Sequence, residues 1–143
     1  MIDVLVSGAS GFIGKPLVEK FRNQSLSVCA LDRKMGDVSD PLTWSKLPET
    51  KSVVHLAGQT YVPDSWKDSR SFINSNVMGT QNALDYALKY DAQFVFISAY
   101  LYGKPEKFRF PKLIESRRTI RMLCPNIWRS KSASFILNLK YEY

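Results

Sequence analysis

The segment from residue 2 to residue 14 constrains the fold of this chain more than any other part of the sequence. A short apolar run leads directly into three glycines with the spacing G-x-x-G-x-x-G, and an amphipathic helical pattern follows. Gly8 allows a sharp turn out of a strand, Gly11 leaves the backbone open to a phosphate, and Gly14 lets the helix pack tightly. The first N–H groups of that helix, at its positive end, would face an anion. The segment therefore predicts a strand–turn–helix unit that binds a pyrophosphate.

Strand and helix patterns alternate through the first 103 residues. Strands are expected at Asp3–Ser7, Leu26–Leu31, Ser52–Ala57 and Phe94–Ser98, with a short strand or turn at 36–38. Helices are expected at about 12–23, 41–47 and 71–90. This alternation predicts an α/β fold with a doubly wound parallel sheet and right-handed crossovers, incomplete at about five strands.

Hydrophobic spacing indicates which residues of these elements are buried. The unbroken apolar run at 26–31 is typical of a strand that is buried on both faces. The residues expected to face the sheet are Phe12, Leu17, Val18 and Phe21 in the first helix, and Phe72, Val77, Ala83, Leu84 and Ala87 in the last.

The charge of the chain changes abruptly near residue 103. Residues 1–103 carry equal numbers of Lys/Arg and Asp/Glu, so the whole net charge of +7 lies in residues 104–143, where the hydrophobic periodicity also disappears. We therefore expect a domain at 1–103 and an irregular, poorly ordered basic tail at 104–143. Such a tail is compatible with nucleic acid binding, but the abruptness of the change favours another origin.

The composition indicates neither a membrane segment nor a metal site. No apolar run approaches the roughly 20 residues that span a bilayer, and Met1 leads into the first strand without a signal-peptide pattern. Cys29 and Cys124 lie far apart without metal-type spacing, and Cys29 falls in an apolar strand. We expect reduced thiols in a cytoplasmic protein.

An acidic residue follows the second expected strand, where a dinucleotide site places its ribose contact. Asp32 would accept hydrogen bonds from the adenosine ribose hydroxyls and repel a ribose phosphate, which favours NAD over NADP. Arg33 opposes this preference, because a guanidinium binds the extra phosphate. Asp37 and Val38 would flank the adenine. Two other interpretations stay open: Asp32 is only a surface acid that ends a strand, and residues 36–38 are only an ordinary turn without contact to a cofactor.

These motifs, with three later strings, occur in the order and spacing of a known family. The later strings are Val54-His55-Leu56-Ala57-Gly58, Asn76-Val77-Met78-Gly79-Thr80 and Phe96-Ile97-Ser98-Ala99-Tyr100-Leu101-Tyr102-Gly103. The first 103 residues resemble the N-terminal part of the extended short-chain dehydrogenase/reductases, the NAD-dependent sugar-nucleotide epimerases and dehydratases. The resemblance implies a Rossmann-like fold, NAD in preference to NADP, and a nucleotide-sugar substrate.

The resemblance also implies roles for individual residues. Ser98 would hydrogen-bond the reacting sugar oxygen, and Asn76 would lie near the nicotinamide ribose and hold the active-site loops. His55 is interpreted as a core residue with satisfied hydrogen bonds rather than as a catalytic one. The remaining cofactor-binding residues would be Gly8, Ser10, Gly11, Phe12, Ile13 and Gly14 in the phosphate loop, and Leu56, Ala57 and Gly58 beyond the strand.

The chain has no credible acid/base helix of the type that this family uses. Its members carry Y-x-x-x-K, in which the lysine lowers the pKa of the tyrosine. Tyr100 and Lys104 have this spacing, but Gly103 and Pro105 oppose the helix that would align them, and no other Y-x-x-x-K occurs. We therefore expect a cofactor-binding fragment with little or no turnover.

Two alternatives stay open. The chain is either a non-catalytic cofactor-binding or interaction protein whose basic tail binds an acidic partner, or a small intact reductase that uses Tyr100. If the elements that normally cover the strand at 94–98 are lost with the tail, exposed apolar surface favours marginal stability or self-association.

A frameshift within about Lys104–Ile114 would explain the charge, the lost periodicity and the early stop together. Codons permitted for Ile120–Asn126 can spell P-Y-A-L-S-K when they are read with an offset of two bases. Sequencing of the coding DNA is expected to show a tyrosine and a lysine four residues apart in that frame. An offset frame without this pair contradicts the hypothesis.

Overall fold

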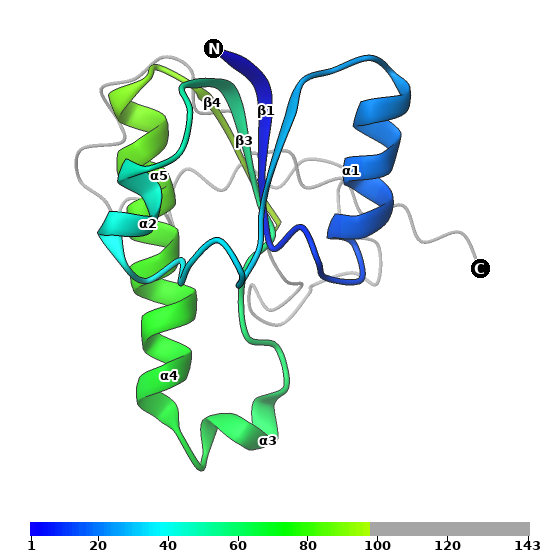
Figure 1. Ribbon diagram of the computed structural model, residues 1–143. Coiled ribbons are helices and arrows are strands. Elements are labelled where there is room, and N and C mark those ends of the chain that lie inside the picture. Colours follow the sequence, from blue (N-terminus) through cyan, green and yellow to red (C-terminus); the bar gives the residue numbers. More distant parts are fainter. Residues whose placement is uncertain (98–143) are drawn as a thin grey trace, which may run out of the picture.

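A computed structural model describes residues 1–97, which form one parallel sheet with helices on both faces (Figure 1). In chain order the elements are β1 (Ile2–Ser7), α1 (Gly14–Asn23), β2 (Val28–Leu31), α2 (Pro41–Ser45), β3 (Thr50–His55), α3 (Val62–Ser65), α4 (Ser69–Ile73), a π-helical turn η1 (Asn74–Met78), α5 (Gly79–Lys89) and β4 (Gln93–Phe96). The expected strand end at Ser98, the tail at 104–143 and the tyrosines at 100 and 102 lie outside the described residues.

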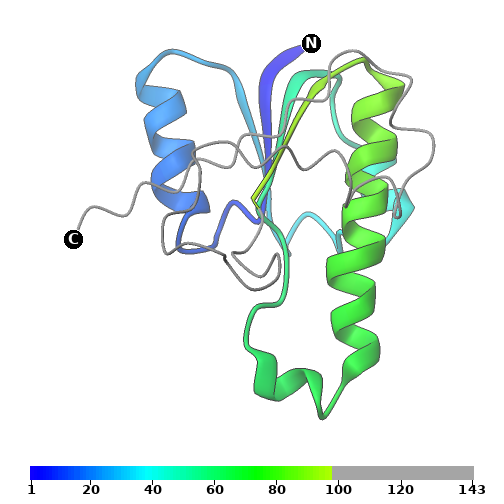
Figure 2. The ribbon, with the colours of Figure 1, turned by 180° about the vertical axis from the view of Figure 1, so that it is seen from behind.

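The four strands of this part of the chain are arranged in the order β2-β1-β3-β4, and all neighbours are parallel. The central strand β1 pairs with β2 from Val4 to Ser7 and with β3 from Ile2 to Ser7. Figures 1 and 2 show α1 on one face of the sheet and α2 and α5 on the other. The expected doubly wound α/β fold is confirmed, because the chain crosses to opposite faces on the two sides of β1.

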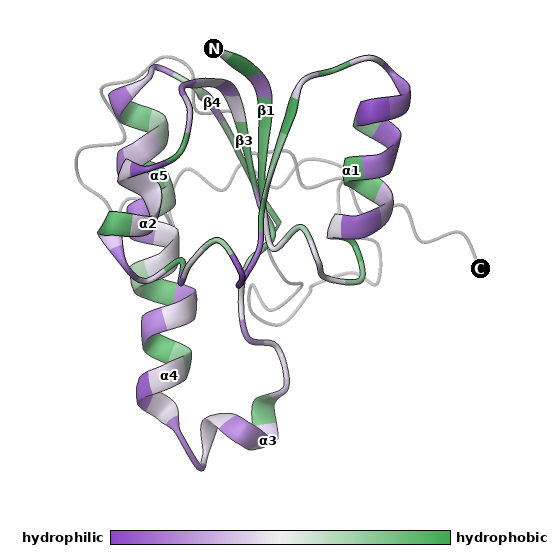
Figure 3. Cartoon of the chain, in the orientation of Figure 1, coloured by the Kyte–Doolittle hydropathy of each residue, from purple (hydrophilic) through white to green (hydrophobic). Residues whose placement is uncertain are grey.

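Alternating side chains of the central strands divide the interior into two cores. Leu5 and Val53 point to the α2/α5 face, where they pack with Trp44 and Phe94. Val4, Val6 and Val54 point to the other face and pack against Val18 of α1. Figure 3 shows the central strands coloured mainly as hydrophobic, as expected for parallel strands covered on both sides.

Three burial expectations are wrong in this part of the chain. The side chain of Phe12 is 98% exposed, because α1 begins at Gly14 and Phe12 lies in the turn before it. Val77 is 47% exposed, since the π-helical turn η1 interrupts the helical period before α5. Within residues 1–97, β2 is an edge strand, so Val28–Ala30 are only partly buried and Leu31 alone is fully enclosed.

Residues 36–38 are not a strand and lead into a turn closed by the Asp40 N–H and the Asp37 carbonyl at 3.1 Å, which leaves four strands in the described chain. Gly36 has φ +151°, a backbone conformation that side-chain-bearing residues rarely adopt, and it lies directly against Thr43 of α2. The carboxylate of Asp40 caps α2 by accepting from the Leu42 N–H at 2.9 Å, and Pro41 occupies the first helical position.

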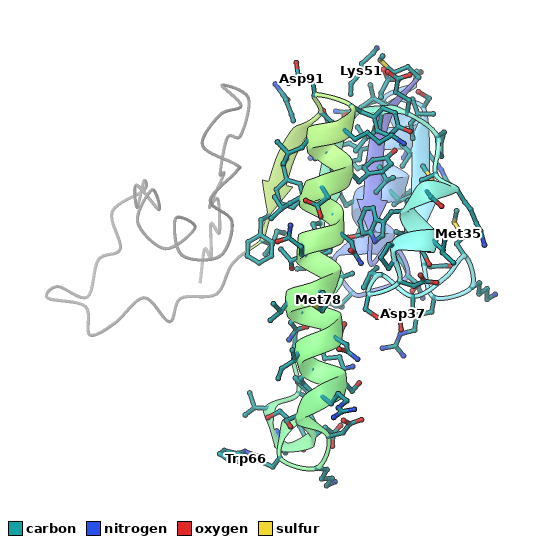
Figure 4. All side chains as sticks on the ribbon, turned by 90° about the vertical axis from the view of Figure 1, so that its left-hand side faces the viewer. Met35, Asp37, Lys51, Trp66, Met78 and Asp91 are labelled. Atoms are coloured by element: carbon teal, nitrogen blue, oxygen red, sulfur yellow. The ribbon has the colours of Figure 1, made fainter. Side chains whose placement is uncertain are left out.

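Several large apolar side chains remain exposed on α3 and the helix that follows it. Trp66 is 87% exposed at the far end of the segment that projects beyond the sheet (Figure 4), and Tyr61 and Ile73 are 66% and 56% exposed. Self-association, which the sequence predicts through apolar surface beside the strand at 94–98, stays a prediction. The helices found in residues 1–97 are all too short or too polar to cross a membrane.

Gly14→Ala is expected to destabilise the domain by about 2 kcal/mol or more. A Cβ atom at Gly14 would clash with the Gly8 carbonyl oxygen and lie 2.8 Å from backbone atoms of Ala9, so the turn or α1 has to move. The free energy of unfolding in urea measures the effect. Gly11→Ala is the control, because its Cβ atom would meet only the Gly8 oxygen at 3.1 Å. Equal stability of the two variants would contradict this packing.

Candidate functional site: a cleft at the carboxyl edge of the sheet

A cleft of about 860 Å³ lies at the carboxyl edge of the sheet, beside the ends of β1, β2 and β3. Its position is the switch point between β1 and β3, where α/β folds place their ligands. The far wall comes from α4 and η1, including Arg70 and Ser71. The cleft brings together Gly8, Ser10, Gly11, Asp32, Arg33, Asp37, Val38, Leu56, Ala57 and Gly58, all of which the sequence predicts as cofactor-binding.

Four predicted residues do not line this cleft: Phe12, Ile13, Gly14 and Asn76. Phe12 and Ile13 lie immediately before α1 and are 98% and 46% exposed. Gly14 allows the start of α1 to pack against the backbone of Gly8 and Ala9. Asn76 lies in η1 and contacts the loop after β3. Ser98 lies outside the residues that the structure describes.

The glycine turn and the loop after β3 are in direct contact. Gly8 has φ +70°, and a Cβ atom there would lie 2.8 Å from the backbone nitrogen of Ala57 and 2.9 Å from the carbonyl carbon of Leu56. Any side chain at this position would therefore push the two loops apart. Gly8 and Gly11 line the cleft without side chains, which suits a group that must approach the main chain closely.

Asp32 follows β2 directly and is partly buried at the cleft. Its Oδ1 atom accepts hydrogen bonds from the backbone N–H groups of Lys34 at 2.9 Å and Met35 at 3.3 Å, which fixes the carboxylate in a local turn. A fixed carboxylate at a strand end is suited to accept hydrogen bonds from vicinal hydroxyls.

Asp37 and Val38 are held by contacts that the sequence pattern does not reveal. Asp37 accepts hydrogen bonds from the N–H and hydroxyl of Ser39 at 2.8 and 2.9 Å, and these bonds, with nearby Arg33, lower the pKa of its carboxyl. In Figure 4, Asp37 lies below α2. The Val38 carbonyl accepts from the indole of Trp44 at 2.8 Å and from the Asn82 amide at 3.0 Å.

Asn76 and Gln59 form a two-way clamp on the loop after β3. The Asn76 Oδ1 atom accepts from the Gln59 backbone N–H at 2.7 Å, and its amide donates to the Gln59 carbonyl at 3.0 Å. The Gln59 side chain in turn donates to the Ser71 hydroxyl at 2.6 Å. Asn76 thus holds a loop, as expected. Sequence reasoning missed Gln59 and Ser71, because nothing local distinguishes them from surface residues.

His55 closes β3 beneath the cleft and is 1% exposed. Its Nδ1 atom lies 2.7 Å from the Ser7 hydroxyl, and its Nε2 atom lies 3.2 Å from the Thr80 hydroxyl. Burial lowers the pKa of the imidazole to about 4. The interpretation of His55 as a core residue with satisfied hydrogen bonds is confirmed.

The comparisons with known proteins agree with this geometry. Residues 4–122 match the family described as the NAD dependent epimerase/dehydratase family. The chain is similar to dTDP-glucose 4,6-dehydratase of Streptomyces antibioticus, with 31% identity over an alignment 171 positions long that covers 99% of this chain and 49% of that protein.

Two similar solved structures contain a nicotinamide cofactor. UDP-glucose 4-epimerase of Thermus thermophilus, complexed with NAD, has a TM-score of 0.65 and 27% identity over 78% of this chain and 43% of its own. RMD of Pseudomonas aeruginosa, complexed with NADPH, has a TM-score of 0.61 and 30% identity over 76% of this chain and 40% of its own. The chain spans less than half the length of each of these relatives.

The buried imidazole predicts a loss of stability in weak acid. Because the pKa of His55 falls from 6.5 to about 4 on folding, the unfolded chain binds more protons between these values, and stability rises with pH. The free energy of unfolding is expected to fall by about 2 kcal/mol from pH 7 to pH 5, as measured by urea denaturation. The residues packed on the ring, which do not titrate in this window, are Ser7, Trp44, Thr80, Phe94 and Phe96.

His55 is the one histidine of the sequence, so His55→Gln is expected to remove most of this slope. A wild-type stability that stays flat from pH 7 to pH 5 would contradict the assignment.

Proposed function

The chain belongs to the NAD dependent epimerase/dehydratase family, and from this membership we propose that its cleft binds the adenosine and pyrophosphate of NAD(P) for chemistry on a nucleotide sugar. The observation that carries the proposal is the glycine turn itself: Gly8 and Gly11 line the cleft without side chains, beside Leu56 and Ala57, and so form a cradle of main chain. This cradle suits a pyrophosphate, because two negatively charged groups need close access to N–H donors.

In this proposal the phosphate loop acts through its main chain. Gly8, Ser10 and Gly11 line the cleft, and Phe12 and Ile13 contribute backbone N–H groups at the start of α1. Gly14 keeps α1 close to the turn, so that the positive end of the helix dipole faces the phosphates.

The adenosine half is assigned to the loop after β2. Asp32 accepts from the ribose hydroxyls, and its fixed negative charge disfavours a phosphate on the ribose, which gives NAD the preference. Arg33 lines the same cleft and reduces the preference. Asp37 meets the exocyclic amine of the adenine and Val38 packs on its ring, with Trp44 and Asn82 holding the Val38 carbonyl.

The remaining assignments concern the reacting end of the site. Leu56, Ala57 and Gly58 form the cleft wall beyond β3, and Asn76 holds that wall through Gln59. Bound NAD(P) supplies a hydride acceptor or donor. Ser98 would hydrogen-bond the sugar oxygen. Because Gly103 and Pro105 oppose a helix at the one Y-x-x-x-K match of the sequence, the 143-residue chain is expected to retain binding with little turnover. Measurable epimerase or dehydratase activity of the purified chain would contradict that last point.

A cytoplasmic location is part of the same proposal. Cys29 is a free thiol in β2, and burial raises its pKa, so it suits a reducing compartment.

Titration calorimetry of the 143-residue chain with NAD and NADP tests the proposal. We expect NAD to bind more tightly than NADP, and Asp32→Asn to reverse or abolish that preference with a change of about tenfold in the ratio of affinities. The amide oxygen of Asn still accepts from the Lys34 N–H, so the local turn is retained while the negative charge is lost.

Asp85→Asn is the matched control, because Asp85 is exposed on α5 and does not line the cleft. It removes the same charge and is expected to leave both affinities unchanged. Absence of NAD and NADP binding by the wild-type chain would overturn the proposed function, and an equal response of the two variants would overturn the role of Asp32.

A further inference from the structure

A continuous chain of hydrogen bonds runs beneath the cleft from β1 to η1. The backbone N–H groups of Leu56 and Ala57 donate to the Ser7 Oγ atom at 3.2 and 3.4 Å. The Ser7 hydroxyl lies 2.7 Å from His55 Nδ1, and His55 Nε2 lies 3.2 Å from the Thr80 hydroxyl. The chain of bonds therefore joins the ends of β1 and β3 to the helix that continues from the far wall.

The hydrogen atoms in this series of hydrogen bonds have one consistent arrangement. The Thr80 hydroxyl donates to the Asn76 carbonyl at 2.6 Å, so toward His55 it can only accept, and Nε2 carries the imidazole proton. The Nδ1 atom of a neutral ring is then an acceptor, and the Ser7 hydroxyl donates to it. Every donor in this series of hydrogen bonds therefore points in the same direction, from the loop after β3 toward the carbonyl of Asn76.

We propose that His55, as the neutral Nε2–H tautomer, is a positioning residue that sets the distance between the glycine turn and the far wall of the cofactor cleft. The inference rests on the proposed function, since it concerns the same cleft. Ser7 directly precedes Gly8, and Leu56 and Ala57 line the cleft. At the other end, Asn76 returns to the same loop through Gln59.

The two connections close a ring around the loop 56–59. One side of the ring passes through Ser7, His55 and Thr80 to the main chain of Asn76, and the other passes from the Asn76 side chain to Gln59. The π-helical turn η1 places both the carbonyl and the side chain of Asn76 in this ring, and such turns occur often at functional sites. A shift of η1 would therefore move the loop that lines the cleft.

The surroundings of the imidazole keep it neutral and rigid. Trp44 of α2 and Phe94 and Phe96 of β4 pack on the ring with centroid distances of 6.1 to 6.2 Å. Within residues 1–97 the ring contacts and hydrogen-bond partners of His55 are all uncharged, so the ring transmits orientation and not charge. The hydrogen bonds from Ser7 through His55 to Thr80, which we call the relay, therefore hold β1 and α5 in a defined relative position. The relay contains only uncharged groups.

Nitrogen NMR of the imidazole and NAD titration test the inference together. The sequence contains one histidine, so its ¹⁵N shifts report one ring, and the Nε2–H tautomer is expected. Thr80→Val removes the acceptor for Nε2 and the donor to Asn76 while keeping shape and helix propensity. We expect it to weaken NAD binding about tenfold, and Thr80→Ser to restore the affinity.

Val53→Ala is the control for loss of stability alone. Val53 lies in the same strand and is fully buried on the α2/α5 face, and truncation destabilises the fold without breaking the relay. It is expected to lower the free energy of unfolding and to leave the NAD affinity of the folded chain unchanged.

The outcomes separate the two proposals. If the wild-type chain does not bind NAD, the proposed function fails and the positioning role fails with it. If the wild type binds and Thr80→Val binds within about twofold of it, only the positioning role fails. An Nδ1–H tautomer in the wild type overturns the proton arrangement by itself, whether or not the variant folds.

Discussion

The approach of the glycine turn to the loop after β3 is the constraint on which the rest of the structure depends. Gly8 has φ +70° and no room for a Cβ atom beside Ala57, so β1 and β3 can end at the same level. Because β1 is the central strand, this contact also sets where α1 begins and where β2 ends. The cleft lies where three chain segments leave the sheet at one edge.

Polar groups beneath the cleft define the relative position of strands and helices more narrowly than the apolar cores do. The two cores hold the helices against the sheet, but apolar contacts tolerate small shifts of one element past another. Directional hydrogen bonds from Ser7 through His55 to Thr80 define one position. In residues 1–97 every buried side-chain polar atom has a hydrogen-bond partner. The cost of removing these groups from water is therefore offset by the hydrogen bonds that they form.

Much of the site could be predicted from short strings, and the errors have physical causes. The glycine spacing, Asp32 after a strand and Leu56-Ala57-Gly58 after another place residues at one edge of a parallel sheet by topology alone. The burial expected for Phe12 extends helical spacing one turn too far, into a loop that belongs to the proposed phosphate cradle. The burial expected for Val77 fails because a π-helical turn shifts the period, and no sequence pattern marks that shift.

The sequence by itself determined the order of the strands, the glycine turn and the family, because these follow from periodicity and from residues only a few positions apart. It did not reveal the short helix α3 or the π-helical turn η1. Tertiary structure alone decided the partners of Asn76 and His55. Gln59 is 17 residues from Asn76, and Ser7 is 48 residues from His55. Such contacts depend on how two strands and a helix pack, and packing is a property of the folded chain that local preferences do not encode.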